Sequence, residues 1–547
     1  MKNLLYLSLL IAGLSGCIKS EKADLILRNA KIYTVDAQFS IGQAMAIRDG
    51  KILEIGRENE ILNKYRYDDV FDAQTRPVFP GFIDAHCHFL GYGLSLQQVD
   101  LTGTTSFQEV LERVVTFSKS NNGSWLEGRG WDQNDWETKA FPTKEQLDKL
   151  FPNQPVYLKR IDGHAALVNS AALSAAGITT SSSIQGGIIE IIDSQLTGIL
   201  VDNALELIDA VIPPPSIEQL TKALIDAEKN CFAVGLTTVD DAGLKKAEVE
   251  LIDQLQKEGK LSMKIYAMLT DNQENMDHYL PNGPFNTDRL NVRSFKFYGD
   301  GSLGSRGACL LQPYSDVTDS SHFGFLLKEP NYYEEAAKKM LEAGFQMNTH
   351  CIGDSANRLL LDIYDKIIPE GQDLRWRIEH CQVLHPDDFK KFKKIGAIPS
   401  IQPTHATSDM YWAQDRLGEK RIKGAYAYND LKEQIGLLAL GTDFPIEGIN
   451  PMNTFYSAVV RQDMQDYPEG GYQTENALSR KDALMGMTIW AAISNFEEGE
   501  KGSLEPGKAA DFVILEKDIL EVPEEQLKNN QVMATFSNGK QVFPIKK

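Results

Sequence analysis

Two histidines that are two residues apart end an apolar segment early in this chain. Residues 80–88 read PGFIDAHCH, and the histidines are His86 and His88. Because side chains on a strand alternate between its two faces, both imidazoles point the same way from one strand end. Two imidazoles placed in this way suit one divalent metal ion without distortion of the backbone. A His-x-His pair also occurs as ordinary core packing, so the later segments decide its meaning.

Four later segments look like short apolar strands that carry or end in residues of related chemistry. They are residues 293–298 with Lys296, residues 346–350 ending in His350, residues 375–380 ending in His380, and residues 437–443 ending in Asp443. Most are separated by enough chain for a helix and loops, an alternation typical of a parallel barrel. In such a barrel the chemistry gathers at the carboxyl ends of the strands. We therefore expect these side chains to meet at one rim.

The cysteines fit the same geometry. Three of the six, Cys87, Cys351 and Cys381, directly follow one of these histidines. If each histidine points into the barrel mouth, the next side chain faces the helix layer, where a small thiol packs well. The alternatives are thiols as metal ligands or in disulfides. Adjacent residues on a strand cannot face one ion together, so we expect free thiols.

Length and charge restrict the class of protein. A chain of 547 residues allows a barrel with appendages. The formal net charge of −20 argues against a nucleic-acid surface. We therefore expect a small molecule as the partner and no nucleic acid, and we leave a homo-oligomer open.

The first residues indicate a targeting signal. Lys2 precedes an apolar stretch from Leu4 to Leu14, which is too short for a stable bilayer anchor, and small residues then lead to Cys17. The pattern resembles the bacterial lipoprotein signal, in which this cysteine is lipidated; an ordinary secretory signal is the alternative. We assign residues 1–17 to a lipoprotein signal. We expect export to the periplasmic or cell-surface side of a bacterial membrane, with membrane contact only through the lipid.

The remaining pattern predicts an α/β protein built around a (β/α)8 TIM barrel. Short strands in residues 23–76 and 500–547, with turn pairs such as Asn538-Gly539, predict one small β-sandwich made by both termini. The barrel occupies residues 77–499. Its eight strands are expected near residues 78–88, 235–240, 263–268, 293–298, 346–350, 375–380, 397–402 and 437–443.

The segment between the first two expected barrel strands contains too many residues to be a simple connecting loop. Residues 89–230 therefore predict an inserted lid subdomain over the barrel mouth. In this insert Trp131 is a candidate substrate contact, with lid packing as the alternative. His164 is a candidate hydrogen-bond donor to an oxyanion, with a structural hydrogen bond as the alternative.

Four imidazoles, one aspartate and one lysine are enough to bind one or two divalent ions, with zinc as the default for nitrogen ligands. Lys296 is the unexpected member, because an ammonium group beside a cation is unfavourable. Either the neutral amine reacts with carbon dioxide to give an anionic carbamate that bridges two metals, or the lysine contacts a substrate carboxylate or a lid acid. Metal-bound water has a pKa of about 7. Asp443 could take its proton and return it to a leaving nitrogen.

Five motifs together resemble the metal-dependent amidohydrolase superfamily, and most closely its branch of N-substituted formamide deformylase-like proteins (amidohydrolase family 3). They are PGFIDAHCH at residues 80–88, DGHA at 162–165, DGSLGS at 300–305, EH at 379–380 and GSLEPGKAADF at 502–512. The resemblance implies a metal site of His86, His88, Lys296, His350, His380 and Asp443. It also implies hydrolysis of a carbon–nitrogen bond that is not a peptide bond, in an amide, formamide or cyclic imide.

Three charged residues near these motifs are further candidates for the substrate site. Asp300 and Arg306 follow Lys296, and Arg461 follows the eighth strand. Asp300 would position the site and the arginines would meet a substrate anion, with ordinary salt bridges as the alternative.

Two other functions stay open at this point. A deaminase or an isomerase could use the same scaffold, because fold does not fix the reaction. A non-catalytic binding or regulatory lipoprotein is the other alternative, although six converging polar groups argue against it.

Overall fold

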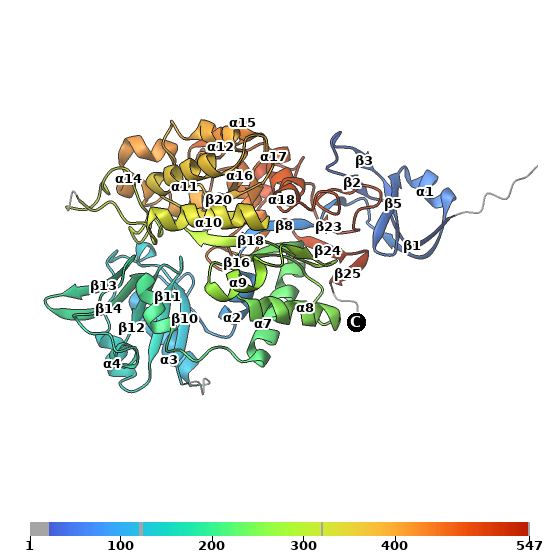
Figure 1. Cartoon of the computed structure of the whole chain (residues 1–547). Helices are drawn as coiled ribbons and strands as arrows, with labels where there is room; N and C mark the ends of the chain where they lie inside the picture. Colours follow the sequence, from blue (N-terminus) through green and yellow to red (C-terminus); the bar gives the residue numbers. More distant parts are fainter. Residues whose placement is uncertain (1–20, 120–123, 319–320, 545–547) are drawn as a thin grey trace, which may run out of the picture.

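The computed structural model describes residues 21–119, 124–318 and 321–544. The expected signal at residues 1–17, with Cys17, lies outside the described residues. Within those ranges no helix combines the length and apolar character needed to cross a bilayer. Figure 1 shows the central barrel with a small β-sandwich on one side and a separate lid on another.

Eight parallel strands form the near-closed barrel, and the TIM-barrel prediction is confirmed. In order around the sheet they are β8 (Phe82–Cys87), β15 (Leu236–Leu244), β16 (Lys264–Thr270), β18 (Leu290–Tyr298), β19 (Gln346–Cys351), β20 (Arg377–His380), β21 (Ile398–Ile401) and β22 (Ala439–Leu440). A short strand, β17 (Phe285–Asn286), pairs antiparallel with β18. The last and first strands meet through the backbone hydrogen bond from Asp443 N to His86 O, at 2.8 Å.

Helices cover the outside of the barrel (Figure 1). They include α7 (Ile217–Ala233), α8 (Lys246–Lys257), α9 (Gln273–Tyr279), α10 (Pro330–Ala343), α11 (Asp354–Ile367), α12 (Phe389–Ile395), α15 (Tyr428–Ile435), α16 (Pro451–Val459), α17 (Arg480–Gly486) and α18 (Ile489–Ser494). Local sequence explains their ends. Helix α7 starts at a capping box of Ser216 and Gln219. Helix α10 stops at Gly344, whose φ of 75° is left-handed.

The insert between the first two barrel strands has a sheet of its own. Its six strands run in the order β13 (Gly187–Ile192), β14 (Gln195–Asp202), β12 (Ala165–Val168), β11 (Val156–Arg160), β10 (Leu126–Trp131) and β9 (Val99–Asp100). Helices α3 (Phe107–Ser118), α4 (Glu145–Leu150), α5 (Ser170–Ala175) and α6 (Glu206–Asp209) complete the lid.

The lid is narrower than the expected range of 89–230. Helix α2 (Phe89–Ser95) lies at the start of that range, and α7 (Ile217–Ala233) overlaps its end. The two pack closely, because a Cβ on Gly93 would lie only 2.1 Å from the carbonyl oxygen of Ala223. These ends of the insert therefore join the helix layer of the barrel.

Both termini build the β-sandwich. One sheet contains β5 (Lys51–Gly56), β4 (Ala44–Arg48), β1 (Glu21–Arg28) and β6 (Tyr65–Asp72), with α1 (Glu58–Lys64) beside it. The other contains β25 (Lys540–Phe543), β24 (Val532–Ser537), β23 (Phe512–Leu515), β7 (Pro77–Pro80), β2 (Lys31–Tyr33) and β3 (Ile41–Gly42). Strand β7 pairs with β2 and β23, so the sandwich continues past the expected boundary at residue 77. The chain enters the barrel only after Gly81.

Candidate metal centre and active-site cavity

The structure brings all six expected ligand residues to one rim of the barrel. His86 lies on β8 and His88 directly after it, while Lys296, His350 and His380 lie on β18, β19 and β20, and Asp443 follows β22. All except the fully buried His86 line one cavity of about 1000 Å³ between the barrel mouth and the lid. Five of the six side chains therefore share one cavity.

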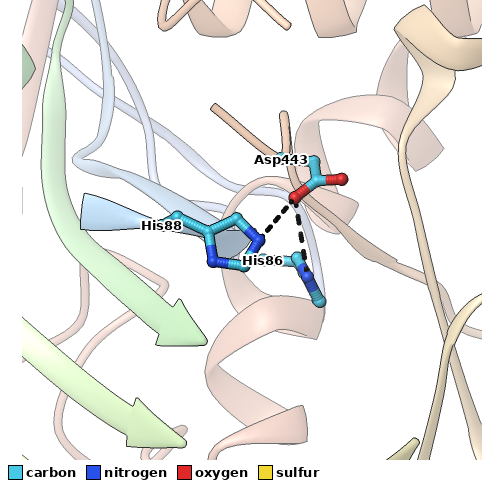
Figure 2. Close-up of side chains that lie close together, drawn as sticks. All are labelled: His86, His88 and Asp443. Carbon is cyan, nitrogen blue, oxygen red and sulfur yellow. Dashed lines mark ion pairs between the residues drawn. The ribbon is translucent and has the colours of Figure 1, made fainter. Parts of the chain in front are cut away.

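Asp443 is at the centre of this group. Its Oδ1 lies 3.2 Å from His88 Nε2 and 3.7 Å from His86 Nε2 (Figure 2). Lys296 Nζ lies 3.0 Å from His86 Nε2. The ring of His380 is 4.9 Å from that of His86 and 4.5 Å from that of His350, measured between centroids. These distances leave the groups close enough to share one or two cations.

Hydrogen bonds outside this group fix how three of the imidazoles point. His86 Nδ1 donates to Glu379 Oε2 at 2.6 Å, and His88 Nδ1 donates to the carbonyl oxygen of Ala242 at 3.0 Å. His380 Nδ1 donates to Gln402 Oε1 at 2.8 Å. Since each Nδ1 carries the proton, each Nε2 keeps a lone pair for a metal.

Two of these residues have left-handed backbones. The φ of His380 is 75° and that of Asp443 is 63°. Such values cost free energy in residues other than glycine and cluster at functional sites. At Asp443 the hydrogen bond from its backbone nitrogen to His86 O holds the conformation in place. Both side chains therefore face the cavity at the cost of local strain.

Sequence reasoning missed His405, which joins this group from α13 (Pro403–Asp409). Its Nε2 lies 3.7 Å from Asp443 Oδ2, and its ring stacks at 17° on the ring of His380. One signal was available, because His405 follows the expected end of the seventh strand by only three residues. Glu379 was also missed as a partner of His86, although it lies in the quoted EH motif.

The donor set fits a divalent metal. His86, His88 and Asp443 form one group whose ligand atoms lie within 4.8 Å of one another, and His380, His405 and Asp443 form a second. Three of the atoms, His350 Nε2, His405 Nε2 and Asp443 Oδ1, are buried and have no hydrogen-bond partner among the residues that the structure describes. Buried polar atoms are rarely left unpaired, so these atoms call for a ligand. Imidazole nitrogen with carboxylate oxygen is a set that zinc accepts.

His164 reaches the same cavity from the lid. Its ring lies 5.2 Å from that of His350, and its Nδ1 donates to Asp202 Oδ1 at 2.7 Å. Burial lowers the pKa of His164, but Asp202 outweighs burial and raises the pKa above its usual value. The structure thus places a hydrogen-bonded, easily protonated imidazole beside the barrel ligands.

Four other expected site residues do not line the cavity. Trp131 is buried in the lid core and donates from Nε1 to Leu158 O at 2.8 Å. Packing inside the lid therefore explains it. Asp300 accepts three backbone N–H groups, from Ile352, Gly353 and Cys309, and so holds the loops after β18 and β19.

The two arginines are also occupied elsewhere. Arg306 forms a two-point ion pair with Asp316, at 2.8 and 3.2 Å. Arg461 is buried and donates from Nε to Tyr472 O at 2.8 Å, with its guanidinium over the ring of Tyr428. Both arginines are thus engaged by protein groups outside the cavity lining, and their contact with a substrate anion stays a prediction.

The cysteines behave as the sequence indicates. Within the described ranges Cys87, Cys231, Cys309, Cys351 and Cys381 are free thiols. Burial raises the pKa of Cys87, Cys351 and Cys381 well above the usual value, which keeps these thiols protonated. They serve as small packing groups behind the histidines.

Replacing Glu379 with glutamine tests its support of His86. The variant loses the carboxylate that receives the Nδ1 proton, so we expect metal affinity to fall by about 10- to 100-fold. Competition with a coloured chelator measures this affinity. Glu498→Gln is a matched control, because Glu498 pairs with Arg375 at 3.0 Å away from the cavity lining. Equal affinity in the two variants would remove Glu379 from the account.

A parallel barrel with histidines and an aspartate gathered under a lid defines the class of barrel hydrolases with a metal centre. Within this class, the chain belongs to the Amidohydrolase family, whose sequence signature matches residues 69–543.

Similar proteins cover nearly the whole chain. "Protein LONG AFTER FAR-RED 3" of Arabidopsis thaliana is 32% identical, over 95% of this chain and 92% of its own length. "Putative amidohydrolase YtcJ" of Bacillus subtilis is 30% identical over 94% and 98%. N-substituted formamide deformylase of Arthrobacter pascens is 25% identical over 95% and 98%. A crystal structure of an uncharacterized metal-dependent hydrolase from Pyrococcus horikoshii matches with a TM-score of 0.75 and 29% identity, over 91% of this chain and 99% of that one.

Proposed function

We propose that this protein hydrolyses a carbon–nitrogen bond other than a peptide bond in a small amide, formamide or cyclic imide, with a divalent metal as cofactor. One observation carries the proposal: among the described residues, buried imidazole and carboxylate atoms without a hydrogen-bond partner converge at a cavity of about 1000 Å³ between the barrel mouth and the lid. Membership of the Amidohydrolase family supports it, as does similarity to a relative named for formamide deformylation.

The residues that would hold one or two ions, zinc by default, are His86, His88, Lys296, His350, His380 and Asp443. When bound, such an ion polarises a carbonyl group and lowers the pKa of water. The side chains of this protein must then position the substrate and move protons.

We assign proton transfer to Asp443. Its Oδ1 is buried beside His88 and has no hydrogen-bond partner, so it is free to accept a proton. Burial raises the pKa of Asp443, but the neighbouring His88, His86 and His380 outweigh burial and keep the carboxylate ionised. Asp443 would take a proton from the attacking water and deliver it to the leaving nitrogen.

We assign stabilisation of the developing oxyanion to His164. Asp202 fixes its Nδ1, so Nε2 is the nitrogen left to face the cavity. A protonated Nε2 is a hydrogen-bond donor of the kind that stabilises a tetrahedral oxyanion. This role requires His164 to lie beside His350, as it does here with ring centroids 5.2 Å apart.

Lys296 suits conversion to a carbamate. It is buried, and burial lowers the pKa of its amine to about 8. The amine is therefore partly neutral near neutral pH, and neutral amine is the form that adds to carbon dioxide. A carbamate would replace a cation with an anion beside the metal ligands.

The Lys296→Ala variant tests the carbamate. We expect it to lose most activity and to regain part of it when acetate or propionate is added, because a short carboxylate can occupy the space of the missing carbamate. The initial rate is followed against acid concentration. Asp443→Asn is the control that should not recover. If no acid in the series restores Lys296→Ala, the lysine is not carbamylated.

A substrate screen tests the reaction itself. Metal-loaded enzyme is incubated with libraries of N-formyl, N-acyl and cyclic amides, and the released products are identified. Formate or another carboxylic acid, absent with Asp443→Asn, supports the proposal. Ammonia released from an amino-substituted ring would instead indicate a deaminase. Full metal loading without turnover of any compound would favour the non-catalytic binding or regulatory alternative.

We also propose that a lipid on Cys17 anchors the exported protein to a bacterial membrane. The sequence from Lys2 to Cys17 supports this proposal, although these residues lie outside the described part of the chain. Labelling cells with a fatty-acid analogue tests it. Wild-type protein should take up the label and Cys17→Ser should not.

A further inference from the structure

One arginine in the cavity wall has no ion-pair partner in the described part of the chain. Arg129 lies on lid strand β10 and lines the cavity. Among the described residues no carboxylate lies within 4.0 Å of its guanidinium. Its Nη2 donates to the carbonyl oxygen of Ile161 at 3.0 Å, and its buried Nε has no hydrogen-bond partner. Burial of a cation without an ion-pair partner costs free energy, and an anionic ligand would offset that cost.

The other basic residues of the same wall are already engaged. Arg160 forms ion pairs with Asp132 and, at 2.6 Å, with Asp162. Lys296 Nζ lies 3.0 Å from His86. Asp162 and Asp443 act electrostatically on Arg129, but Asp162 is held by Arg160 and Asp443 belongs to the candidate metal-binding groups. Arg129 is therefore the arginine of this wall that is left for a ligand.

The backbone beside the guanidinium connects it to the reaction centre. A Cβ on Gly163 would lie 3.0 Å from Arg129 Nη2, and the φ of Gly163 is +73°. Glycine thus leaves space for the guanidinium at this point. The next residue is His164, whose ring lies beside His350. A molecule held by Arg129 would therefore extend directly towards the metal ligands.

We propose that Arg129 binds a carboxylate of the substrate, so that the amide to be cleaved is an N-acyl or N-formyl amino acid or a similar monoanion. This inference rests on the proposed hydrolase function and specifies its substrate. A guanidinium matches a carboxylate with two parallel hydrogen bonds. Asp409 and Glu447 also line the cavity, so a doubly charged phosphonate would meet more repulsion than a carboxylate.

The test compares matched substrates that differ only in charge. N-acylglycine carries the carboxylate, N-acylethanolamine replaces it with a neutral alcohol, and N-acyl aminomethylphosphonate carries a dianion. Wild-type enzyme should prefer the carboxylate. Arg129→Gln should lower kcat/KM for N-acylglycine by about 10- to 100-fold, mainly through KM, because a hydrogen-bonded charge is lost. The rate with the alcohol should change little.

Two further variants test whether the effect is specific to the guanidinium of Arg129. Arg129→Lys should retain part of the preference. Arg28→Gln should change nothing, because Arg28 pairs with Asp72 at 3.0 Å on β1 of the sandwich, away from the cavity lining. Equal loss of activity on acid and alcohol in Arg129→Gln, or no preference in the wild type, would overturn the proposal.

Turnover and binding can also fail separately. If the wild type hydrolyses none of the three compounds, the proposed reaction fails for this class, and calorimetry of N-acylglycine binding decides the inference alone. Binding that weakens by at least tenfold in Arg129→Gln supports the carboxylate site. Equal binding by wild type and Arg129→Gln, or no binding by either, refutes it.

Discussion

Replacing Asp443 with asparagine is expected to lower kcat by about 10²- to 10⁴-fold on any amide that the enzyme hydrolyses, the range for loss of a positioned acid–base group. The substitution keeps the size of the side chain but removes the oxygen that accepts and returns the proton. Four histidine ligand candidates remain, so most of the metal should stay bound. Steady-state rates and elemental analysis of the same sample measure the two properties together.

The essential result is that Asp443→Asn loses turnover while it keeps its metal. The melting temperature should stay near that of the wild type, because Asp443→Asn preserves the backbone hydrogen bond to His86. Near-normal rates in a fully folded Asp443→Asn variant would show that another group moves the proton. His405, 3.7 Å from the other carboxylate oxygen, would then be the first residue to examine.

Replacing His380 with alanine should give the opposite pattern. The imidazole lies between His86 and His350 and is oriented by Gln402, so its loss removes a ligand from the middle of the group. Removing a residue that only supports a ligand typically lowers metal affinity by about 10- to 100-fold. We expect a larger fall here, because a ligand itself is lost. Activity should fall with it and recover in part when excess metal is added. Chelator competition and rate measurements across metal concentrations test this.

Gln402→Ala provides a graded comparison for His380→Ala. It removes the hydrogen bond to Nδ1 but leaves the imidazole in place, so the loss of affinity should be smaller. If His380→Ala binds metal as tightly as the wild type, His380 is not a ligand. The metal site would then have to be built from the other five candidates, which are His86, His88, Lys296, His350 and Asp443.

The sequence was sufficient to predict the barrel and the convergence of its six polar residues. The ends of the strands can be located in the sequence, because apolar segments such as residues 80–88 end in polar residues that a hydrophobic core does not accommodate. A parallel barrel then forces such ends to one rim. The lid was predicted from length alone, because no loop spans so many residues.

The sequence could not predict how side chains are oriented at and beyond the strand ends. His380 and Asp443 adopt left-handed backbones, which a regular strand pattern does not predict. His405 reaches the site from a helix, so its position depends on how α13 packs. Trp131 and Arg461 carry side chains suited to binding, but packing buries them elsewhere. Arg129 became a candidate only from its position in the cavity wall, which depends on the fold of the lid.

Elemental analysis of protein purified without chelator tests the central claim most directly. The account predicts about one to two equivalents of a divalent transition metal per chain, zinc by default, with the amount reduced in His380→Ala and retained in Asp443→Asn. Wild-type protein that stays metal-free even after dialysis against zinc, and whose melting temperature does not respond to the metal, would contradict it.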